Sequence, residues 1–280
     1  MPPSISVIPP KFIYGTAWKE DDTHRLTSLA IQSGFRGIDT ANQRKHYVEA
    51  DVGEAIQRQI DVGLITRDEL FIQTKFTHLG GQDHRLPYDA KAPIYDQVEQ
   101  SFARSLDHLR IKVIDSYVLH GPSMRHGLSD QDWKAWRAIE DVYLAGKTRS
   151  IGVSNVSVEQ LALLIEHARV KPHCVQNRCF ASLGWDNKVR QLCKGHGLIY
   201  QGFSLLTANR QLWQSKLIRT LADQHNLTPA QVIFSLALDL DMLPLTGTTH
   251  PDHMIDDLQS QSNILSKDVV SRLERCMLAR

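Results

Sequence analysis

The sequence lacks the features of a secreted or membrane-bound protein. Its 280 residues contain no apolar run near the length of about 18 that a membrane span needs. The opening segment, MPPSISVIPP, lacks the basic start and long apolar stretch of a signal peptide. The four cysteines (Cys174, Cys179, Cys193 and Cys276) include no CxxC pair. We therefore expect a cytoplasmic protein with reduced thiols and no contact with a membrane.

Strong charge of either sign is also absent. The chain has 32 Lys+Arg against 31 Asp+Glu and no dense basic block, so we expect no nucleic-acid partner. The 13 histidines include His250 and His253, which are spaced as at the start of a helix, but no third ligand accompanies them in a zinc pattern. We expect a metal-free monomer that binds small molecules.

Two glycine motifs that would indicate nucleotide binding are incomplete. AGKT at 145–148 resembles the end of a phosphate-binding loop, but Asp141 stands where that motif needs a glycine. Gly195 and Gly197 begin a dinucleotide-binding pattern whose third glycine is replaced by Tyr200. A dinucleotide would have to bind without the Rossmann fingerprint.

Short apolar runs that alternate with segments of helical period are present along the whole chain. This alternation is typical of βα units that feed a parallel sheet. One (β/α)₈ barrel takes about 250 residues, so we predict a single barrel domain over 1–280, with a doubly wound sheet as the alternative. The candidate strands lie near 11–16, 37–40, 70–76, 115–120, 149–155, 173–177, 198–204 and 242–247.

The segments between these runs have apolar residues at intervals of three and four, which predicts amphipathic helices that cover the barrel. Ser157 is placed to cap one helix, and Thr228 followed by Pro229 to start another. The apolar positions are Val52, Ile56 and Ile60; Val98, Phe102, Leu106 and Leu109; Trp133, Trp136, Ile139 and Tyr143; and Val158, Leu161, Leu164 and Ile165.

Four polar residues fall at or just after predicted strand ends: Asp39, Tyr47, Lys75 and His120. A tyrosine supported by a lysine, an aspartate and a histidine makes a proton donor for carbonyl reduction. Each residue alone could instead cap a turn, face solvent or fill the core. Together they lie on the face where barrel enzymes place their chemistry.

Several motifs in fixed order resemble the aldo-keto reductases: GFRGIDTA, Tyr47 before VGEAI, IQTKF, DSYVLHGP, GKTRSIGVSN, VQN, GFSLL and TPAQVIFSLAL. The resemblance runs from about Gly15 to about Leu258. It implies a (β/α)₈ barrel that binds a nicotinamide cofactor across the carboxyl ends of its strands and reduces an aldehyde or ketone.

The resemblance also implies a role for each of the four polar residues. Tyr47 would donate the proton, and the Lys75 ammonium would make its phenol more acidic than the ordinary pKa of about 10. Asp39 would hold Lys75, and His120 would orient the substrate carbonyl. The number of residues between Asp39 and Tyr47 is larger than is usual in the family, and Arg44 stands at the usual tyrosine position. The spacing from Tyr47 to Gly53 instead supports Tyr47 as the proton donor.

Cofactor contacts are implied in the same way. Ser154, Asn155 and Gln176 would bind the nicotinamide carboxamide, and Phe203 would lie under its ring. Ser204 to Leu206 would approach the pyrophosphate, while Trp18 and Gly121 would border the substrate, Gly121 replacing a common tryptophan. The remaining implied contacts are Thr16, Thr246, Gly247, Thr248, His253 and Asp257.

The segment after the last strand lacks the lysine and arginine that hold the NADPH 2′-phosphate in many members. We expect NADPH, with less discrimination against NADH than usual. We also expect no long C-terminal loop. The alternatives are a nicotinamide-binding barrel of low turnover that acts as a redox sensor or partner-binding module, and a cofactor-independent lyase or isomerase. The presence of all four catalytic residue types argues against the first.

Overall fold

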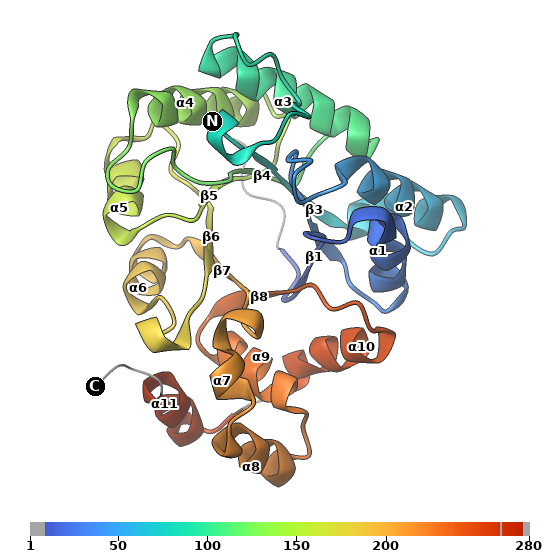
Figure 1. Cartoon of the computed structure of the whole chain (residues 1–280), viewed down its shortest axis with the longest axis vertical. Helices are drawn as coiled ribbons and strands as arrows, with labels where there is room; N and C mark the ends of the chain where they lie inside the picture. The colour runs from blue at the N-terminus through green and yellow to red at the C-terminus, as the bar shows by residue number, and fades with distance from the viewer. Residues whose placement is uncertain (1–8, 264, 277–280) are drawn as a thin grey trace.

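Eight parallel strands close into a barrel in this computed structural model, which describes residues 9–263 and 265–276 (Figure 1). Each strand pairs with the next along the chain, and β8 pairs with β1. The barrel prediction is therefore confirmed, and the doubly wound alternative is wrong because the first and last strands pair. The strands are β1 (Ile13–Gly15), β2 (Gly37–Asp39), β3 (Phe71–Phe76), β4 (Ser116–Leu119), β5 (Ile151–Ser154), β6 (Cys174–Arg178), β7 (Ile199–Phe203) and β8 (Met242–Thr246).

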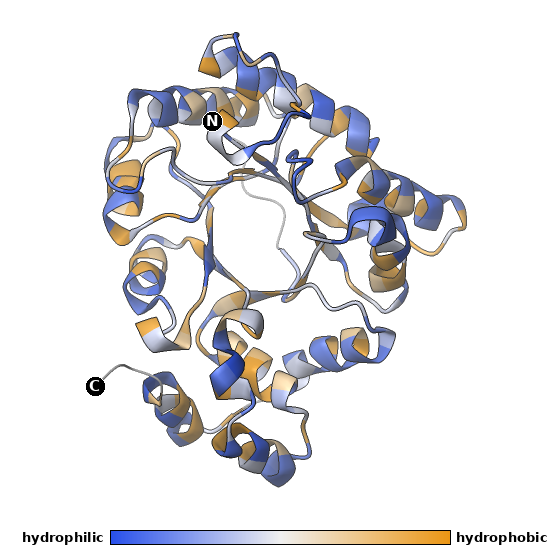
Figure 2. Cartoon of the chain, in the orientation of Figure 1, coloured by the Kyte–Doolittle hydropathy of each residue, from blue (hydrophilic) through white to orange (hydrophobic). Residues whose placement is uncertain are grey.

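Helices form a ring around the barrel (Figure 1). Hydrophobic residues face the strands and hydrophilic residues are frequent along the outer helices (Figure 2). No helix in the two described ranges is long and apolar enough to cross a membrane. The α-helices are α1 (Thr23–Gln32), α2 (Glu49–Asp61), α3 (Ile94–Leu109), α4 (Asp130–Leu144), α5 (Val158–His167), α6 (Asn187–His196), α7 (Arg210–Trp213), α8 (Lys216–His225), α9 (Pro229–Asp239), α10 (Pro251–Gln259) and α11 (Lys267–Arg275).

The predicted apolar faces of α2 to α5 are buried or partly buried against the core. Close packing of α2 against α3 requires Gly53, because a Cβ there would lie 2.0 Å from the His108 backbone oxygen. The Ser157 cap is also confirmed, since its side chain accepts from the Gln160 amide. These contacts fix the ring of helices, and with it the loops at the strand ends.

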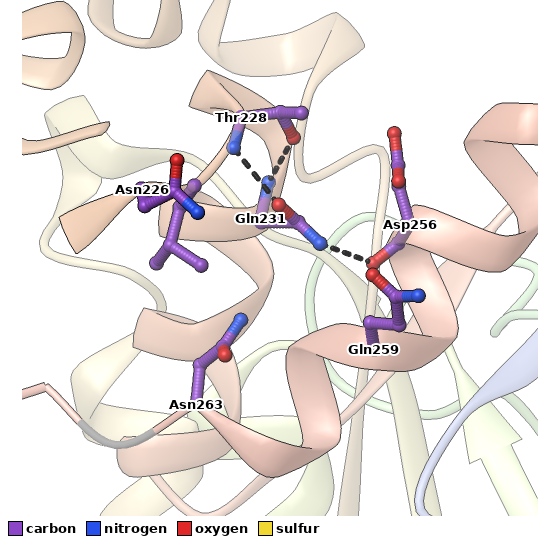
Figure 3. A pocket seen from close by; sticks show the side chains of 7 residues that line it. Asn226, Thr228, Gln231, Asp256, Gln259 and Asn263 are labelled. Carbon is purple, nitrogen blue, oxygen red and sulfur yellow. Dashed lines mark hydrogen bonds between the residues drawn. The ribbon is translucent and has the colours of Figure 1, made fainter. Parts of the chain in front are cut away.

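Thr228 caps α9 as predicted, with Pro229 in its first turn. The capping partner Gln231 also donates its side-chain amide to the Asp256 backbone oxygen, 3.0 Å away, and so ties α9 to α10 (Figure 3). These residues line a polar hollow of about 450 Å³ beside α10. The arrangement holds α10, which follows the carboxyl end of β8.

Candidate active site

The carboxyl ends of β2, β3 and β4 bring the predicted catalytic residues together. Asp39 ends β2, Lys75 is the residue before the end of β3, and His120 directly follows β4. Tyr47 lies in the loop between β2 and α2. Parallel strands place their carboxyl ends at one face of the barrel, so the four side chains meet there.

Lys75 and Asp39 form a buried ion pair. The Lys75 ammonium lies 2.6 Å from Asp39 Oδ1 and donates a second bond to the Thr40 backbone oxygen at 2.8 Å. Lys75 is 0% exposed. Burial lowers the pKa of Lys75, while the Asp39 carboxylate acts to raise it. A buried charge needs such a partner, since removal from water is costly for either ion alone.

A layer of glutamines supports this ion pair from inside the barrel. Asp39 Oδ1 also accepts bonds from the amides of Gln73 at 2.7 Å and Gln176 at 3.0 Å. Gln73 and Gln201 each donate their side-chain amide to the side-chain oxygen of the other, at 2.8 and 2.9 Å, across the interior between β3 and β7. The Asp39 carboxylate is therefore fixed by donors from two strands, β3 and β6.

Tyr47, rather than Arg44, lies beside the ion pair. The Lys75 ammonium is 5.4 Å from the centre of the Tyr47 ring, and the His120 ring is 5.9 Å from it. Arg44 instead pairs with Glu20 at 3.0 Å. The longer spacing after Asp39 is thus taken up by a turn that brings Tyr47 to the site.

The start of α2 anchors this turn. The Tyr47 amide donates to the Gln43 backbone oxygen at 3.0 Å. Two residues further on, the buried Glu49 carboxylate accepts a bond from the Thr74 hydroxyl and lies 3.0 Å from His108 Nδ1. Glu49 therefore joins the helix after Tyr47 to β3, the strand that carries Lys75.

The expected acidification of Tyr47 is not found. Burial raises the pKa of the Tyr47 phenol, and the nearby Asp39 carboxylate raises it further. Asp39 offsets the charge of Lys75, which explains why the ammonium does not dominate. The phenol therefore keeps its proton near neutral pH, and the neutral form is the one that can donate.

His120 is neutral as well. Burial lowers its pKa to about 3, and the charge of Lys75 adds to the effect. Its Nδ1 lies 2.7 Å from the Thr77 hydroxyl. If Nδ1 accepts from that hydroxyl, the ring proton is on Nε2, where it can donate to a carbonyl oxygen.

The predicted carboxamide contacts lie on neighbouring strands. The Ser154 hydroxyl donates to the Gln176 backbone oxygen at 2.6 Å, and the Asn155 amide donates to the His120 backbone oxygen at 2.8 Å. The Gln176 amide is directed to Asp39 and Gln201 inside the barrel. Ser154 and Asn155 thus lie at the face, whereas Gln176 also belongs to the layer below it.

The ends of β1 and β7 carry the next group of predicted contacts. The Thr16 hydroxyl is buried and donates to the Asp39 backbone oxygen at 2.9 Å. Phe203 ends β7 with a partly exposed ring, and Ser204 follows with a φ of 57°. Leu206 packs against the core. The Phe203 ring and the backbone after it are therefore the accessible parts.

After β8 the predicted residues separate into buried and exposed ones. Thr246 donates its hydroxyl to the buried Asp257 carboxyl at 2.7 Å, and burial raises the pKa of Asp257 to about 7. Gly247 is exposed, and its oxygen accepts a bond from the Lys19 ammonium. Thr248 is partly exposed, and His253 is exposed. Asp257 therefore supports the loop from behind.

The two predicted substrate-pocket residues lie near the same face. Trp18 is 70% exposed, and its ring packs 3.8 Å, centre to centre, from that of His46, the neighbour of Tyr47. A Cβ on Gly121 would lie 3.4 Å from Asn155 Cβ. This is an ordinary van der Waals distance, so the backbone at position 121 has room for a Cβ.

Sequence reasoning missed the supporting residues. Gln73 and Gln201 each stand two residues before a predicted site residue on the same strand, and a period of two would have placed them on the same side. Lys19 comes from the loop after β1, far in sequence from Gly247. No local pattern indicates that contact, because it depends on closure of the barrel between β8 and β1.

Comparison with known proteins agrees with this architecture. The aldo/keto reductase family matches residues 13–277. The glyoxal reductase of Bacillus subtilis (strain 168) is 29% identical over 88% of this chain and 80% of its own length. The methylglyoxal reductase DkgA of Escherichia coli (strain K12) is 26% identical over 92% of this chain and 86% of its own length.

A solved structure supports the fold. The crystal structure of MGS-M4, an aldo-keto reductase enzyme from a Medee basin deep-sea metagenome library, covers 97% of this chain and 92% of its own, with a TM-score of 0.82 and 23% identity. The protein belongs to the aldo/keto reductase family, whose members are oxidoreductases acting on carbonyl groups.

Proposed function

We propose that this protein reduces an aldehyde or ketone to an alcohol with NADPH, using Tyr47 as the proton donor. The observation that carries the proposal is the buried Lys75–Asp39 ion pair beside Tyr47 and His120. Its relatives include reductases of glyoxal and methylglyoxal. A reactive small aldehyde is thus a suitable first substrate to test.

The residues fit each part of this reaction. The bound NADPH supplies the hydride that reaches the carbonyl carbon. His120 Nε2 donates a hydrogen bond that orients the carbonyl oxygen. Tyr47 transfers its phenolic proton to that oxygen as the electron pair of the C=O bond moves onto it. Lys75 then lies beside the phenolate that remains and favours it by charge.

The chain also has groups suited to a phosphorylated dinucleotide. The first turn of α10 has no side-chain cap, so its amides are free to meet an anion near Thr246 to Thr248. Lys19 brings a positive charge to Gly247 that the loop itself lacks. This cation supports NADPH over NADH, with a smaller preference than a lysine and arginine pair would give.

The test is a screen of NADPH and NADH oxidation against aldehydes, ketones and dicarbonyls, with fluorescence titration of both cofactors. We expect turnover of at least one carbonyl and tighter binding of NADPH. Lys19→Met should narrow that difference. Tight binding without any turnover would contradict the proposed reaction, and a clear preference for NADH would contradict the cofactor assignment.

A further inference from the structure

Arg178 projects toward the mouth of the candidate active site. It ends β6, where side chains alternate between the two faces of the strand. Cys174 and Gln176 are on the same side as Arg178, and both contact groups inside the barrel: Cys174 lies 3.9 Å from Gln73 Oε1, and Gln176 bonds Asp39. Arg178 is thus the next residue of β6 on the side that faces the barrel interior, and it lies at the carboxyl end of this strand.

The Arg178 side chain packs against Phe203. The two residues are register partners on β6 and β7, and the guanidinium carbon lies 5.7 Å from the centre of the Phe203 ring. This is within the range of a cation–π contact. Arg178 is exposed and has no ion-pair partner in the part of the chain that the structure describes. Its donors are therefore available to a ligand.

The four candidate catalytic residues carry no net charge. Lys75 and Asp39 neutralise each other, and Tyr47 and His120 are both uncharged near neutral pH. Arg178 therefore adds a positive charge at the same end of the barrel as this neutral group of residues. A guanidinium presents paired N–H donors that match the two oxygens of a carboxylate.

We propose that Arg178 selects carbonyl substrates that carry a carboxylate. This inference rests on the proposed function and narrows it to anionic aldehydes or ketones. The neutral Tyr47 and His120 act on the carbonyl oxygen, while Arg178 binds the carboxylate and so fixes the direction in which the substrate enters.

A matched pair of substrates tests the proposal: 4-formylbenzoate and its methyl ester. They share the ring and the aldehyde and differ in charge. We expect the wild-type kcat/KM to be higher for the anion, and Arg178→Gln to lower the anion-to-ester ratio at least about tenfold. Arg178→Lys keeps the charge without the paired donors and should give an intermediate ratio.

Lys188→Gln is the control, because Lys188 is an exposed cation near the start of α6, in the connection that follows β6. It should leave the ratio unchanged. If Arg178→Gln lowered kcat/KM equally for both substrates and raised the KM for NADPH, Arg178 would be assigned to the cofactor and the proposal would be overturned. An unchanged anion-to-ester ratio would also overturn it. If wild-type protein turns over no carbonyl at all, the proposed function has failed and this inference with it.

Discussion

The carboxyl end of the barrel buries the ion pair of Lys75 and Asp39, whereas the amino end surrounds a hollow whose lining surface is mainly apolar. At the carboxyl end, Lys75 and Asp39 are bonded to each other and to the glutamine layer. At the amino end, the first residues of β3 and β7, Phe71 and Ile199, help line a hollow of about 680 Å³. Burial raises the pKa of Cys174 there to about 11, so this thiol stays protonated.

This difference shows where the fold tolerates buried polarity. Gln201 belongs to both regions, since it lines the hollow and bonds Gln73 and Gln176. Above it Lys75 and Asp39 pair with each other, and at the amino end the buried Asp115, directly before β4, pairs with Arg67 and Arg149 at 2.6 and 3.0 Å. At both ends the buried carboxylate has a cation beside it, but only at the carboxyl end is the cation, Lys75, fully buried as well. Substitutions at the two ends should then have very different effects.

The largest effect is expected for Tyr47→Phe. Loss of the proposed proton donor should lower kcat by roughly 10² to 10⁴, with cofactor affinity nearly unchanged. Stopped-flow turnover and fluorescence titration of NADPH measure the two quantities. Tyr95→Phe is the control, because its hydroxyl bonds Asp141 on the outer helices. Retained turnover would mean that another group, with His120 the first candidate, donates the proton.

Lys75→Met should lower both turnover and stability. The change leaves the Asp39 carboxylate buried without its cation, which costs about 3–5 kcal/mol in the free energy of unfolding. Urea unfolding measures this loss. The double variant Lys75→Met with Asp39→Asn should recover part of the stability but none of the turnover. A single variant as stable as wild type would argue against a buried, charged pair.

The glutamine layer should respond more weakly. Gln73→Leu removes a donor to Asp39 and leaves the Gln201 amide without its partner, which should cost about 1–3 kcal/mol. Adding Gln201→Leu removes the unpartnered group and should restore part of that loss. Turnover should fall in both variants, because Asp39 loses the same donor. Unfolding curves of the two variants test this explanation. If the two substitutions only removed packing contacts, their losses of unfolding free energy would add, and the double variant would be less stable than Gln73→Leu.

The sequence indicates the barrel better than it indicates the site. Eight apolar runs and the caps at Ser157 and Thr228 depend on local patterns, and all are found in the structure. The period of two could place Gln73 and Gln201 on the inner side of their strands, but it could not pair them, and no local pattern indicates the contact of Lys19 with Gly247. The pKa of Tyr47 was also misjudged, because it depends on how closely Asp39 offsets Lys75.

Asp257 should make stability depend on pH. Its carboxyl ionises near pH 4 in an unfolded chain and near pH 7 in the folded protein. The raised pKa stabilises the fold fully below about pH 4, and this contribution is lost as the pH rises to about 7. Asp257→Asn keeps an acceptor for Thr246 and removes the titration, so its stability relative to wild type should rise by about 2 kcal/mol between pH 5 and pH 8. Thermal unfolding measures the change, with the exposed Asp252→Asn expected to show none.

The smallest effect is expected at the amino end. Lys171 is exposed beside the apolar hollow and has no ion-pair partner in the described ranges. Lys171→Gln should change the free energy of unfolding by no more than about 0.5 kcal/mol, and it should leave kcat/KM unaltered. Steady-state kinetics of this variant and of Arg178→Gln should be measured together. Lys171 precedes β6 and Arg178 ends it, so the two variants each remove one exposed cation from opposite ends of this strand. An equal shift in substrate preference would show that overall charge, rather than position at the carboxyl end, guides the substrate. A shift with Arg178→Gln alone would locate anion recognition at the mouth, where its guanidinium faces Phe203.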